Sequence, residues 1–300
     1  MFNINDITRG LFGRAALMRR SGSDPSPVPL PADIDLTADT LDSRVSYTGP
    51  AHAYLDSSGG VSPAAANAWP LEYLNGVAIG RHEPEKASSN IVTDMRFTTN
   101  SASTPAWRYM GSGVLSPTPS SAVDGGVGFK ATNTYNKPAI YDGATFILPD
   151  TAPWIDRTLN PVWIRRRVSA VFSAASSAAR FYFARLDSSN YVYFSNAAPA
   201  GAVVMSVFSR SVTGESNIII SLPQAEPGTI ATSPILSGTT RSASSVTVSK
   251  DGDTDGVMVH FNTGDSVQLP FGSAASVALP LSAVDWAARY ITRISYYQEG

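Results

Sequence analysis

From about residue 44 onward, the chain is a nearly unbroken series of short segments that favour β-strands. These segments are rich in Val, Ile, Tyr and Phe, and clusters of Gly, Pro, Asn and Asp separate them. Several alternate between apolar and polar residues, as in Ser245–Ser249, where Val246 and Val248 share one face. Strands at this spacing predict an all-β sandwich or jelly roll, and the lack of a long internal repeat argues against a propeller or solenoid. The expected strands cover residues 45–54, 76–79, 90–92, 163–172, 179–186, 191–195, 203–209, 217–222, 245–249, 257–261, 266–269 and 288–297.

Residues 1–20 carry the clearest helical pattern in the sequence, and we expect a short amphipathic helix over residues 4–20. Asn5 or Asp6 can act as its N-cap. Its apolar stripe recurs at spacings of three and four residues and is formed by Ile7, Leu11, Ala15 and Met18. Because an isolated helix of this length is marginal in water, the stripe is expected to pack against something. The candidates are the chain's own body, a neighbouring protein, and further copies of the chain around a trimer axis.

Residues 21–43 are predicted to form a Pro-rich linker. They contain four prolines at alternate positions, Pro25, Pro27, Pro29 and Pro31. Such a segment is extended and semi-stiff and acts as a spacer. A helix, a linker and a β-sandwich body over residues 44–300 would suit a module that is tethered to a larger particle. Residues 44–100 are a candidate for a small β subdomain of their own.

Charge and residue usage exclude several classes of protein. The formal net charge is −2 and the pI about 5.9, which argues against nucleic acid as a partner. The absence of cysteine rules out disulfides, thiolate metal sites and cysteine nucleophiles, and suits assembly in a reducing cytoplasm. No apolar run reaches the roughly 18 residues needed to cross a bilayer. Asp6 and Arg9 interrupt the N-terminus, so we expect neither a signal peptide nor membrane insertion.

Three stretches resemble a family of tail and virion proteins from tailed phages and prophages. Arg44–Asn67 combines an Arg-x-Ser opening, an aromatic residue, an Asp-x-x-Gly turn and an Ala-Ala-Asn segment. Gly76–Trp107 is similar to the family's Gly-hydrophobic-hydrophobic-Ile-Glu-Pro segment and its Ala-Trp ending, although the Glu-Pro pair is shifted to Glu83 and Pro84. Tyr290–Tyr297 is similar to the family's closing Ile-x-Arg-hydrophobic-x-Tyr-Tyr strand, after which the family's usual helical arm does not follow here.

The resemblance implies an all-β fold, with a jelly-roll or lectin-like β-sandwich of the concanavalin A or carbohydrate-binding-module type. It implies a structural or attachment component of the virion, such as a tail fibre or tail-tip protein, and no catalytic residue. By analogy with phage fibres we expect a homotrimer that is assembled in the host cytoplasm and contacts other virion proteins through residues 1–40. A host surface glycan is a further expected partner. The alternatives are a head-decoration or head-fibre protein and, from another class, a polysaccharide hydrolase.

Asp251, Asp253 and Asp255 form the sharpest local motif, in the run Asp-Gly-Asp-Thr-Asp-Gly. Carboxylates at alternate positions before a glycine match the first half of a calcium loop. The twelfth position is Asn262 in place of the usual glutamate. The competing interpretation is a solvated hairpin turn between residues 245–249 and 257–261, since Asp-Gly is a common turn pair. The turn is favoured, and calcium is the cofactor that the motif leaves open.

The remaining polar candidates point only weakly to chemistry. The three histidines, His52, His82 and His260, lack metal-ligand spacing. We expect His260 on the solvent face of a strand, and His82 in a charged, solvated turn. Arg165–Arg167 is expected to form ion pairs across a sheet or subunit interface. A glycosidase would need two facing carboxylates, for which the candidates are Glu83 with Glu85, Asp142 with Asp150, and Asp187.

Aromatic side chains are the better functional clue. Rings stack on the apolar faces of sugars, although Trp and Tyr in strands are more often core residues. In the run Tyr191-Val192-Tyr193-Phe194, alternation places Tyr191 and Tyr193 on one face. We take Trp107, Tyr191 and Tyr193 as the candidates for glycan or interface contact.

Overall fold

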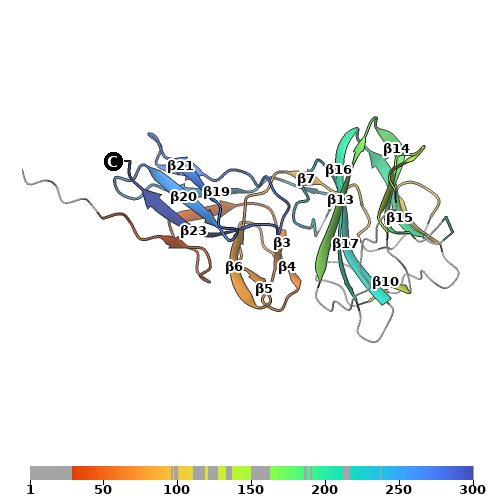
Figure 1. Cartoon of the computed structure of the whole chain (residues 1–300), viewed down its shortest axis with the longest axis horizontal. Helices are drawn as coiled ribbons and strands as arrows, with labels where there is room; N and C mark the ends of the chain where they lie inside the picture. The colour runs from red at the N-terminus through yellow and green to blue at the C-terminus, as the bar shows by residue number, and fades with distance from the viewer. Residues whose placement is uncertain are drawn as a thin grey trace, which may run out of the picture. The chain divides into compact units, whose positions relative to one another are not determined.

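The computed structural model of the chain describes residues 29–95, 97, 101–110, 119–120, 128–132, 137–149, 163–185, 188–189, 191–211, 217–236 and 238–299. Every regular element in these ranges is a β-strand, and every pair of strands is antiparallel (Figure 1). The protein is therefore all-β, as the strand-like segments predict. The expected N-terminal helix lies outside the described residues. No helix in the described ranges is long and apolar enough to cross a membrane.

One group of strands is built from the two ends of the described chain. Its larger sheet has the order β21–β20–β23–β6–β5, with β1 also paired to β23. The strands are β1 (Ile34–Asp35), β5 (Glu72–Leu74), β6 (Val77–His82), β20 (Gly256–Phe261), β21 (Ser266–Pro270) and β23 (Tyr290–Tyr297). A smaller sheet has the order β2–β19–β22 and consists of β2 (Val45–Thr48), β19 (Ser245–Ser249) and β22 (Ser276–Ala278).

The two sheets of this group share one hydrophobic core. Val246 and Val248 of β19 are fully buried, and they pack with Val257 and Val259 of β20. Alternation within each strand therefore directs one set of side chains into the core, as the sequence pattern predicts. The core also contains Ile34 of β1, together with Leu36, Val45, Tyr47, Trp69, Phe261, Phe271, Leu279, Ile291, Ile294 and Tyr296.

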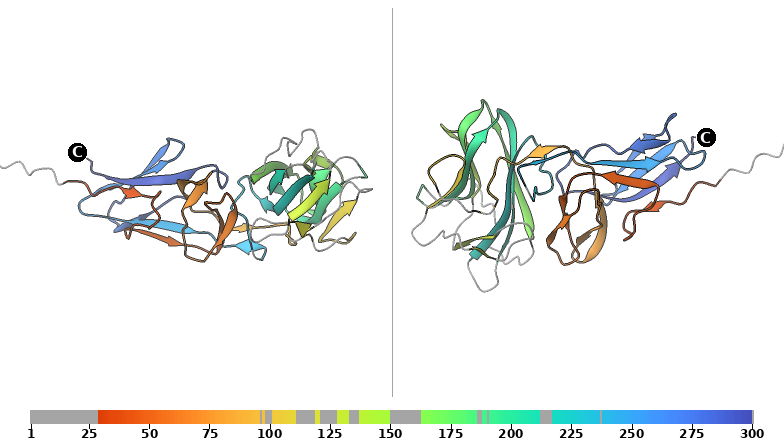
Figure 2. Two further views of the ribbon diagram at one scale, coloured as in Figure 1. Left: turned by 90° about the horizontal axis from the view of Figure 1, so that it is seen from below. Right: turned by 180° about the vertical axis from the view of Figure 1, so that it is seen from behind.

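The second group of strands lies within residues 106–227 and forms two five-stranded sheets that face each other (Figures 1 and 2). One sheet has the order β12–β11–β14–β15–β8, and its strands are β8 (Ala106–Met110), β11 (Ala139–Tyr141), β12 (Phe146–Leu148), β14 (Ser176–Arg185) and β15 (Tyr191–Ala198). The other has the order β13–β16–β17–β10–β9, and its strands are β9 (Pro119–Ser120), β10 (Gly128–Thr132), β13 (Ile164–Phe172), β16 (Gly201–Ser211) and β17 (Asn217–Pro227).

A second hydrophobic core fills the space between these two sheets. Phe181 and Phe183 of β14 and Phe194 of β15 are fully buried and pack with Val203 and Met205 of β16. Side chains at alternate positions of β14 and β15 point the other way, onto the outer face of their sheet. Two short pairs complete the strands, β3 (His52–Leu55) with β4 (Val61–Ala64) and β7 (Ser88–Ser89) with β18 (Thr240–Arg241).

The body begins earlier than the predicted boundary at residue 44. Residues from Pro31 onward belong to one compact unit. Ile34 pairs with Ile294 of β23, and both Ile34 and Leu36 are fully buried. The Pro-rich linker expected over residues 21–43 is therefore too long at its C-terminal end. The proline spacing does not reveal where the linker ends and the β body begins, because the buried residues Ile34 and Leu36 follow shortly after the last proline, Pro31.

The loop that carries Asp251, Asp253 and Asp255 is not the hairpin turn that the sequence favours. β19 pairs with β2 and β22, whereas β20 pairs with β21 and β23. The loop therefore connects two different sheets. Local turn chemistry predicts a tight reversal, but it carries no information on which strands become neighbours.

Candidate functional site

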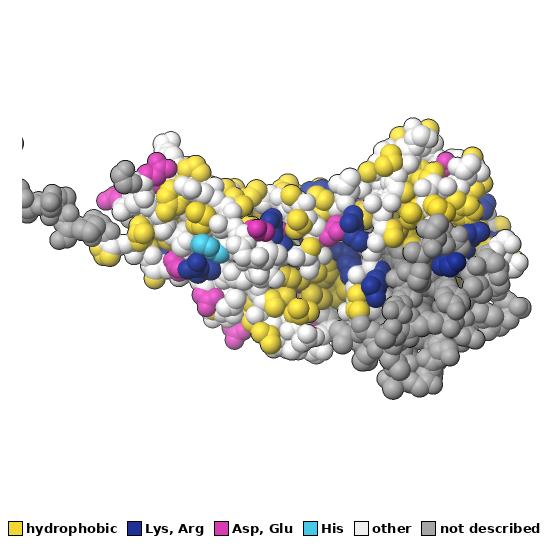
Figure 3. Space-filling view, in the orientation of Figure 1, with side chains coloured by type: hydrophobic (Ala, Val, Ile, Leu, Met, Phe, Trp, Pro, Cys, Tyr) yellow, Lys and Arg dark blue, Asp and Glu magenta, His cyan; other side chains and the backbone are white. Residues whose placement is uncertain are grey.

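The outer face of the sheet β12–β11–β14–β15–β8 presents aromatic and basic side chains in rows, and we call it the aromatic face. Strand register sets the rows. The first row joins Tyr141, Arg180 and Ser195, the second Ala139, Tyr182, Tyr193 and Arg108, and the third Arg185, Tyr191 and Met110. Phe146 of β12 is the cross-strand neighbour of Tyr141 and extends the first row. Figure 3 shows hydrophobic side chains with basic ones beside them over β14 and β15.

Close ring contacts hold the aromatic face together. Tyr191 and Tyr193 are stacked, with their ring centroids 5.3 Å apart and an interplanar angle of 28°. Tyr182 lies 4.7 Å from Tyr193, and Phe146 lies 5.2 Å from Tyr141. Tyr191 and Tyr193 thus share one face, as alternation predicts. Burial raises the pKa of Tyr182 and of Tyr193, so both hydroxyls stay protonated and able to donate hydrogen bonds at neutral pH.

Arginine side chains lie over these rings. The guanidinium carbon of Arg180 is 5.0 Å from the centroid of Tyr141 and 5.3 Å from that of Tyr193. The guanidinium carbon of Arg185 is 4.4 Å from the centroid of Phe146. All three distances are within the range of cation–π attraction. The stacked guanidinium groups cover the centre of the face, which explains why Tyr182 and Tyr193 are buried although they belong to an outer surface.

Accessible groups surround this covered centre. Phe146 is 38% exposed and Met110 is 42% exposed, while Tyr141 and Tyr191 are half-buried. The face therefore offers ring surface to a ligand mainly through Phe146, Tyr141 and Tyr191.

Trp107 does not belong to this surface. It is fully buried in the core between the two five-stranded sheets and lies 4.3 Å from Phe97, centroid to centroid. Its indole N–H donates to the main-chain oxygen of Asp94. The prediction of a glycan or interface contact for Trp107 is wrong because this residue occupies the core-facing position of β8, next to the outward Arg108.

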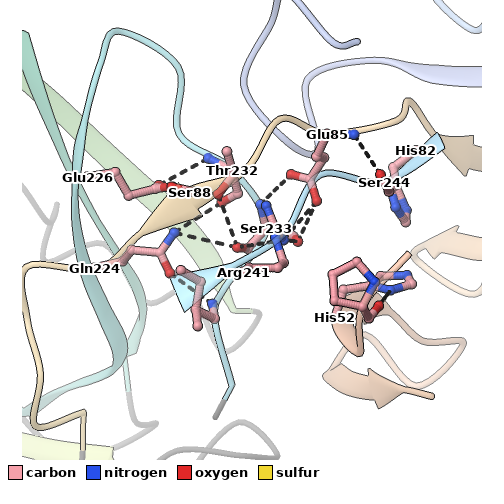
Figure 4. A network of polar contacts seen from close by, with 12 residues as sticks. His52, His82, Glu85, Ser88, Gln224, Glu226, Thr232, Ser233, Arg241 and Ser244 are labelled. Atoms are coloured by element: carbon pink, nitrogen blue, oxygen red, sulfur yellow. Dashed lines mark hydrogen bonds and ion pairs between the residues drawn. The ribbon is translucent and has the colours of Figure 1, made fainter. Parts of the chain in front are cut away.

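A second candidate site is a buried polar network around Glu85 and Arg241 (Figure 4). The guanidinium of Arg241 lies 2.9 Å from Oε2 of Glu85, and both side chains are almost completely buried. Glu85 also accepts hydrogen bonds from the main-chain N–H of Ser233 at 2.5 Å and from its hydroxyl at 2.6 Å. Burial alone would raise the pKa of Glu85, but Arg241 and these donors hold it below its ordinary value.

The network continues through Glu226 of β17. The hydroxyl of Thr232 donates to Oε1 of Glu226 at 2.5 Å, and the hydroxyl of Ser88 donates to the same oxygen. The side-chain carbonyl of Gln224 accepts from the main-chain N–H of Ile235 at 2.9 Å. β7, β17, β18 and the segment between β17 and β18 all contribute to this network. Its donors and acceptors are largely matched within the protein, which is characteristic of a structural element.

A buried histidine pair lies next to this network. The rings of His52 and His82 have centroids 4.8 Å apart, and each side chain is 2% exposed. Nδ1 of His82 donates to Oε1 of Glu72 at 2.7 Å, and Nδ1 of His52 lies 3.0 Å from the carbonyl oxygen of Pro50. Burial, reinforced by His82, lowers the pKa of His52 to about 4. The prediction of a solvated turn around His82 is wrong, because β6 carries this residue into the interior.

The predicted glycosidase carboxylates are each engaged in structure, where the structure describes them. Glu83 forms a bidentate ion pair with Arg289, at 2.7 Å and 2.9 Å, and Glu85 pairs with Arg241. Asp142 accepts the main-chain N–H groups of Ala144 and Thr145 in the turn between β11 and β12. Asp150 and Asp187 lie outside the described residues.

Within the arginine cluster Arg165–Arg167, Arg165 and Arg167 lie in different environments. Arg165 donates to the hydroxyl of Ser206 at 2.9 Å and lies over Trp286, with 5.4 Å between its guanidinium carbon and the ring centroid. Arg167 forms an exposed ion pair with Asp285 at 2.9 Å, in agreement with the expected ion pairing. His260 is half-buried and shares a hydrogen bond of 2.7 Å with the hydroxyl of Ser295.

Two of the three aspartates of the predicted calcium motif, Asp251 and Asp255, have separate side-chain partners. Asp251 lies 3.2 Å from a guanidinium nitrogen of Arg44, and Asp255 accepts the main-chain N–H of Glu299. In the part of the chain that the structure describes, no three His, Cys, Asp or Glu side chains are placed to hold one metal ion. Calcium binding by this loop stays a prediction that metal titration can test.

Comparison with known proteins identifies no relative, so any functional inference is based on the fold and its surfaces. Neither a family model, nor a curated protein, nor a solved structure matches this chain.

The sequence pattern locates only part of the aromatic face. It identifies Tyr191 and Tyr193 but not Phe146, Arg180 or Arg108, which reach the face from three other strands. Alternation within β14 contains a usable signal, because Arg180 and Tyr182 are the polar-tipped residues between the apolar Ala179, Phe181 and Phe183. The alternation does not show, however, that β14 pairs with β15, so it cannot place Arg180 and Tyr182 beside Tyr191 and Tyr193.

Proposed function

We propose that this chain is a non-enzymatic structural and attachment component of a tailed-phage virion, as a tail fibre or tail-tip protein with a lectin-like sandwich. Its aromatic face contacts a host surface glycan. The observation that carries the proposal is the row arrangement of Phe146, Tyr141 and Tyr191 on one sheet face, next to stacked arginine side chains. Rings in this arrangement suit the apolar faces of successive sugars, and the guanidinium groups suit hydroxyl or acidic substituents.

The partners of the candidate glycosidase carboxylates favour a binding role. Glycoside hydrolysis needs two carboxyl groups that face each other across the sugar. Glu83 and Glu85 are instead held by arginine partners, and Asp142 caps a turn. Because these three carboxylates already have structural partners, their arrangement favours an attachment protein over a hydrolase.

Binding of the glycan tests the proposal directly. Phe146→Ala and Tyr191→Ala should each weaken binding of full-length protein to host surface polysaccharide about threefold to tenfold, because each removes one stacking ring. Val171→Ala is a matched control, since Val171 is 69% exposed on β13, in the opposite sheet. Equal affinities for all four proteins in a biolayer binding assay would refute a contact through the aromatic face.

Placement and oligomeric state need separate measurements. Immunogold labelling of particles should decorate the tail, and label on the capsid would favour the alternative of a head-decoration or head-fibre protein. Light scattering coupled to gel filtration should give the mass of a homotrimer. Release of reducing ends from host polysaccharide by the pure protein would favour the hydrolase alternative instead.

A further inference from the structure

We infer that the aromatic face selects acidic polysaccharides, whose sugars carry carboxylate or other oxyanion groups, over neutral ones. This inference rests on the proposed function, because it names the class of glycan that the same face would bind. Two arginine side chains, Arg108 and Arg180, supply the selectivity.

The first step is the charge content of the face. Among the residues that the structure describes, no carboxylate lies within ion-pair distance of Arg108 or Arg180. Arg108 lies 3.8 Å from the sulfur of Met110, which is a weak acceptor. Asp142, in the turn that follows β11, has Oδ1 committed to the main-chain N–H groups of Ala144 and Thr145. Arg108 and Arg180 thus carry positive charge that no carboxylate among the described residues neutralises.

The second step is the way in which Arg180 is held. Its guanidinium lies over both Tyr141 and Tyr193, and it hydrogen-bonds with the hydroxyl of Tyr182. A stacked guanidinium keeps its remaining N–H donors within its own plane, where they match the two oxygens of a carboxylate. Arg180 is therefore ordered before a ligand binds, so less side-chain entropy is lost on binding.

The third step excludes the most obvious other occupant, a second copy of the chain. A symmetric contact through the aromatic face would place the arginine side chains of two or three copies against one another. Like charges brought together and desolvated in this way oppose association. An acidic sugar chain supplies the missing negative charge and also rests its apolar faces on Phe146 and Tyr191. Single-stranded nucleic acid has similar chemistry, but three arginines, Arg108, Arg180 and Arg185, on a chain of net charge −2 provide little of the basic groove that it requires.

The test compares one sugar backbone in two charge states. Full-length protein is titrated with polygalacturonate and with its fully methyl-esterified form, in which the carboxylates are neutral. We expect polygalacturonate to bind at least about tenfold more tightly at low ionic strength, and we expect this preference to shrink as salt is added. A sulfated polysaccharide and a single-stranded oligonucleotide form the remaining arms. Tighter binding of the sulfated chain than of its desulfated form extends the inference to other oxyanions, whereas preference for the oligonucleotide would overturn it.

Variants separate the charge from the stacking. The double variant Arg108→Gln and Arg180→Gln should lose the preference for the acidic form while keeping its affinity for the ester. Arg180→Lys retains the charge but loses planar bidentate recognition, so it should give an intermediate ratio. Arg167→Gln is the matched control, because Arg167 is exposed on β13 and outside the face. Thermal melts of each variant show whether it is folded.

The failures of the two proposals are distinguishable. If polygalacturonate and its methyl ester bind equally and Tyr191→Ala weakens the binding of each, the selectivity for acidic glycans is refuted while the proposed function stands. If neither probe binds and host surface polysaccharide does not bind either, the proposed function fails and this inference fails with it.

Discussion

At the scale of single residues, this protein combines a low overall charge with an unusual number of buried ionisable groups. Only 15% of its residues are charged, yet Glu85, Arg241, Glu72 and Glu226 all lie in the interior. Each is matched by a hydrogen-bonding or ionic partner. Such groups contribute little net free energy of folding when they are paired, but they destabilise strongly when one partner is removed. Their effect on stability should therefore depend on pairing and on pH.

Acid should destabilise the protein through His52. Its pKa is about 4 in the folded state and about 6.5 in an unfolded chain, so the unfolded state binds the extra proton first. The contribution is fully present above pH 6.5 and is lost as the pH falls toward 4, by about 2 to 3 kcal/mol at pH 4.5. Urea unfolding at pH 7.5 and 4.5 measures this loss. His52→Phe should remove most of it.

The control for this effect is His260→Gln. The pKa of His260 is also lowered by burial, but this residue is only half-buried, so the variant should keep most of the acid loss. The same loss of stability in wild type and in His52→Phe would show that other groups govern acid sensitivity.

Breaking the buried pair should be far more harmful than breaking an exposed one. Arg241→Ala leaves Glu85 charged in the interior and should lower the free energy of unfolding by about 3 to 5 kcal/mol. Arg293→Ala removes a pair of similar length, Arg293 with Asp33 at 2.7 Å, but both partners are about half exposed. It should change stability by at most about 1 kcal/mol. Chemical denaturation compares the two, and similar losses would mean that water reaches the Glu85 network.

At the scale of strands, sequence patterning accounts for the elements but not for their neighbours. Alternation correctly assigns the buried side chains of Ser245–Ser249 and, in residues 191–194, the two tyrosines that share one face. It fails for Trp107 and His82, whose chemical type suggests a surface role although their strand positions face inward. The alternation pattern also does not predict strand order, because some paired strands are more than 150 residues apart in the sequence, as β2 and β19 are. Part of the aromatic face depends on such order and could not be predicted locally.

Glycine positions show where strands approach closely. Gly80 in β6 has φ of +115°, and a Cβ at this position would overlap the carbonyl oxygen of Ile291 in β23. Gly80→Ala should therefore lower the free energy of unfolding by about 2 to 5 kcal/mol, from backbone strain and overpacking together. Gly264→Ala is the control, since Gly264 has φ of +90° with open space around it, and about 1 kcal/mol of strain is expected. Equal effects on the thermal midpoint would contradict the close approach.

At the scale of the whole molecule, the first core is discontinuous in sequence and the second is contiguous. β1 and β2 pack with β19–β23, whereas strands β8–β17 form their own core, which also includes Ile91, Val92 and Phe97 from the segment just before β8. The resemblance to phage proteins is carried by three stretches and predicts a single β-sandwich module over residues 44–300. It does not indicate that the module contains two packed groups of strands.

Truncation at the N-terminus should separate anchoring from folding. A chain that starts at Pro31 should melt within about 2 °C of the full-length protein, because residues from Pro31 onward form one compact unit. A chain that starts at Leu41 lacks the fully buried Ile34 and Leu36, and should lose at least about 4 kcal/mol of stability. If residues 1–40 anchor the protein, the Pro31 chain should stay folded but fail to co-sediment with assembled particles. Normal incorporation of the Pro31 chain would contradict the anchoring role.

The pairing of β1 with β23 has a consequence for synthesis on the ribosome. Ile34 meets Ile294 only after about 260 further residues have been added. At about 5 to 20 residues per second, the apolar residues of β1 wait roughly 13 to 50 s for their partners in β23. The strands within residues 106–227 emerge together and can fold while the first core is still open. The chain therefore completes its first-made core last, and it is vulnerable to premature release or to pairing with a neighbouring nascent chain until its final strand is made.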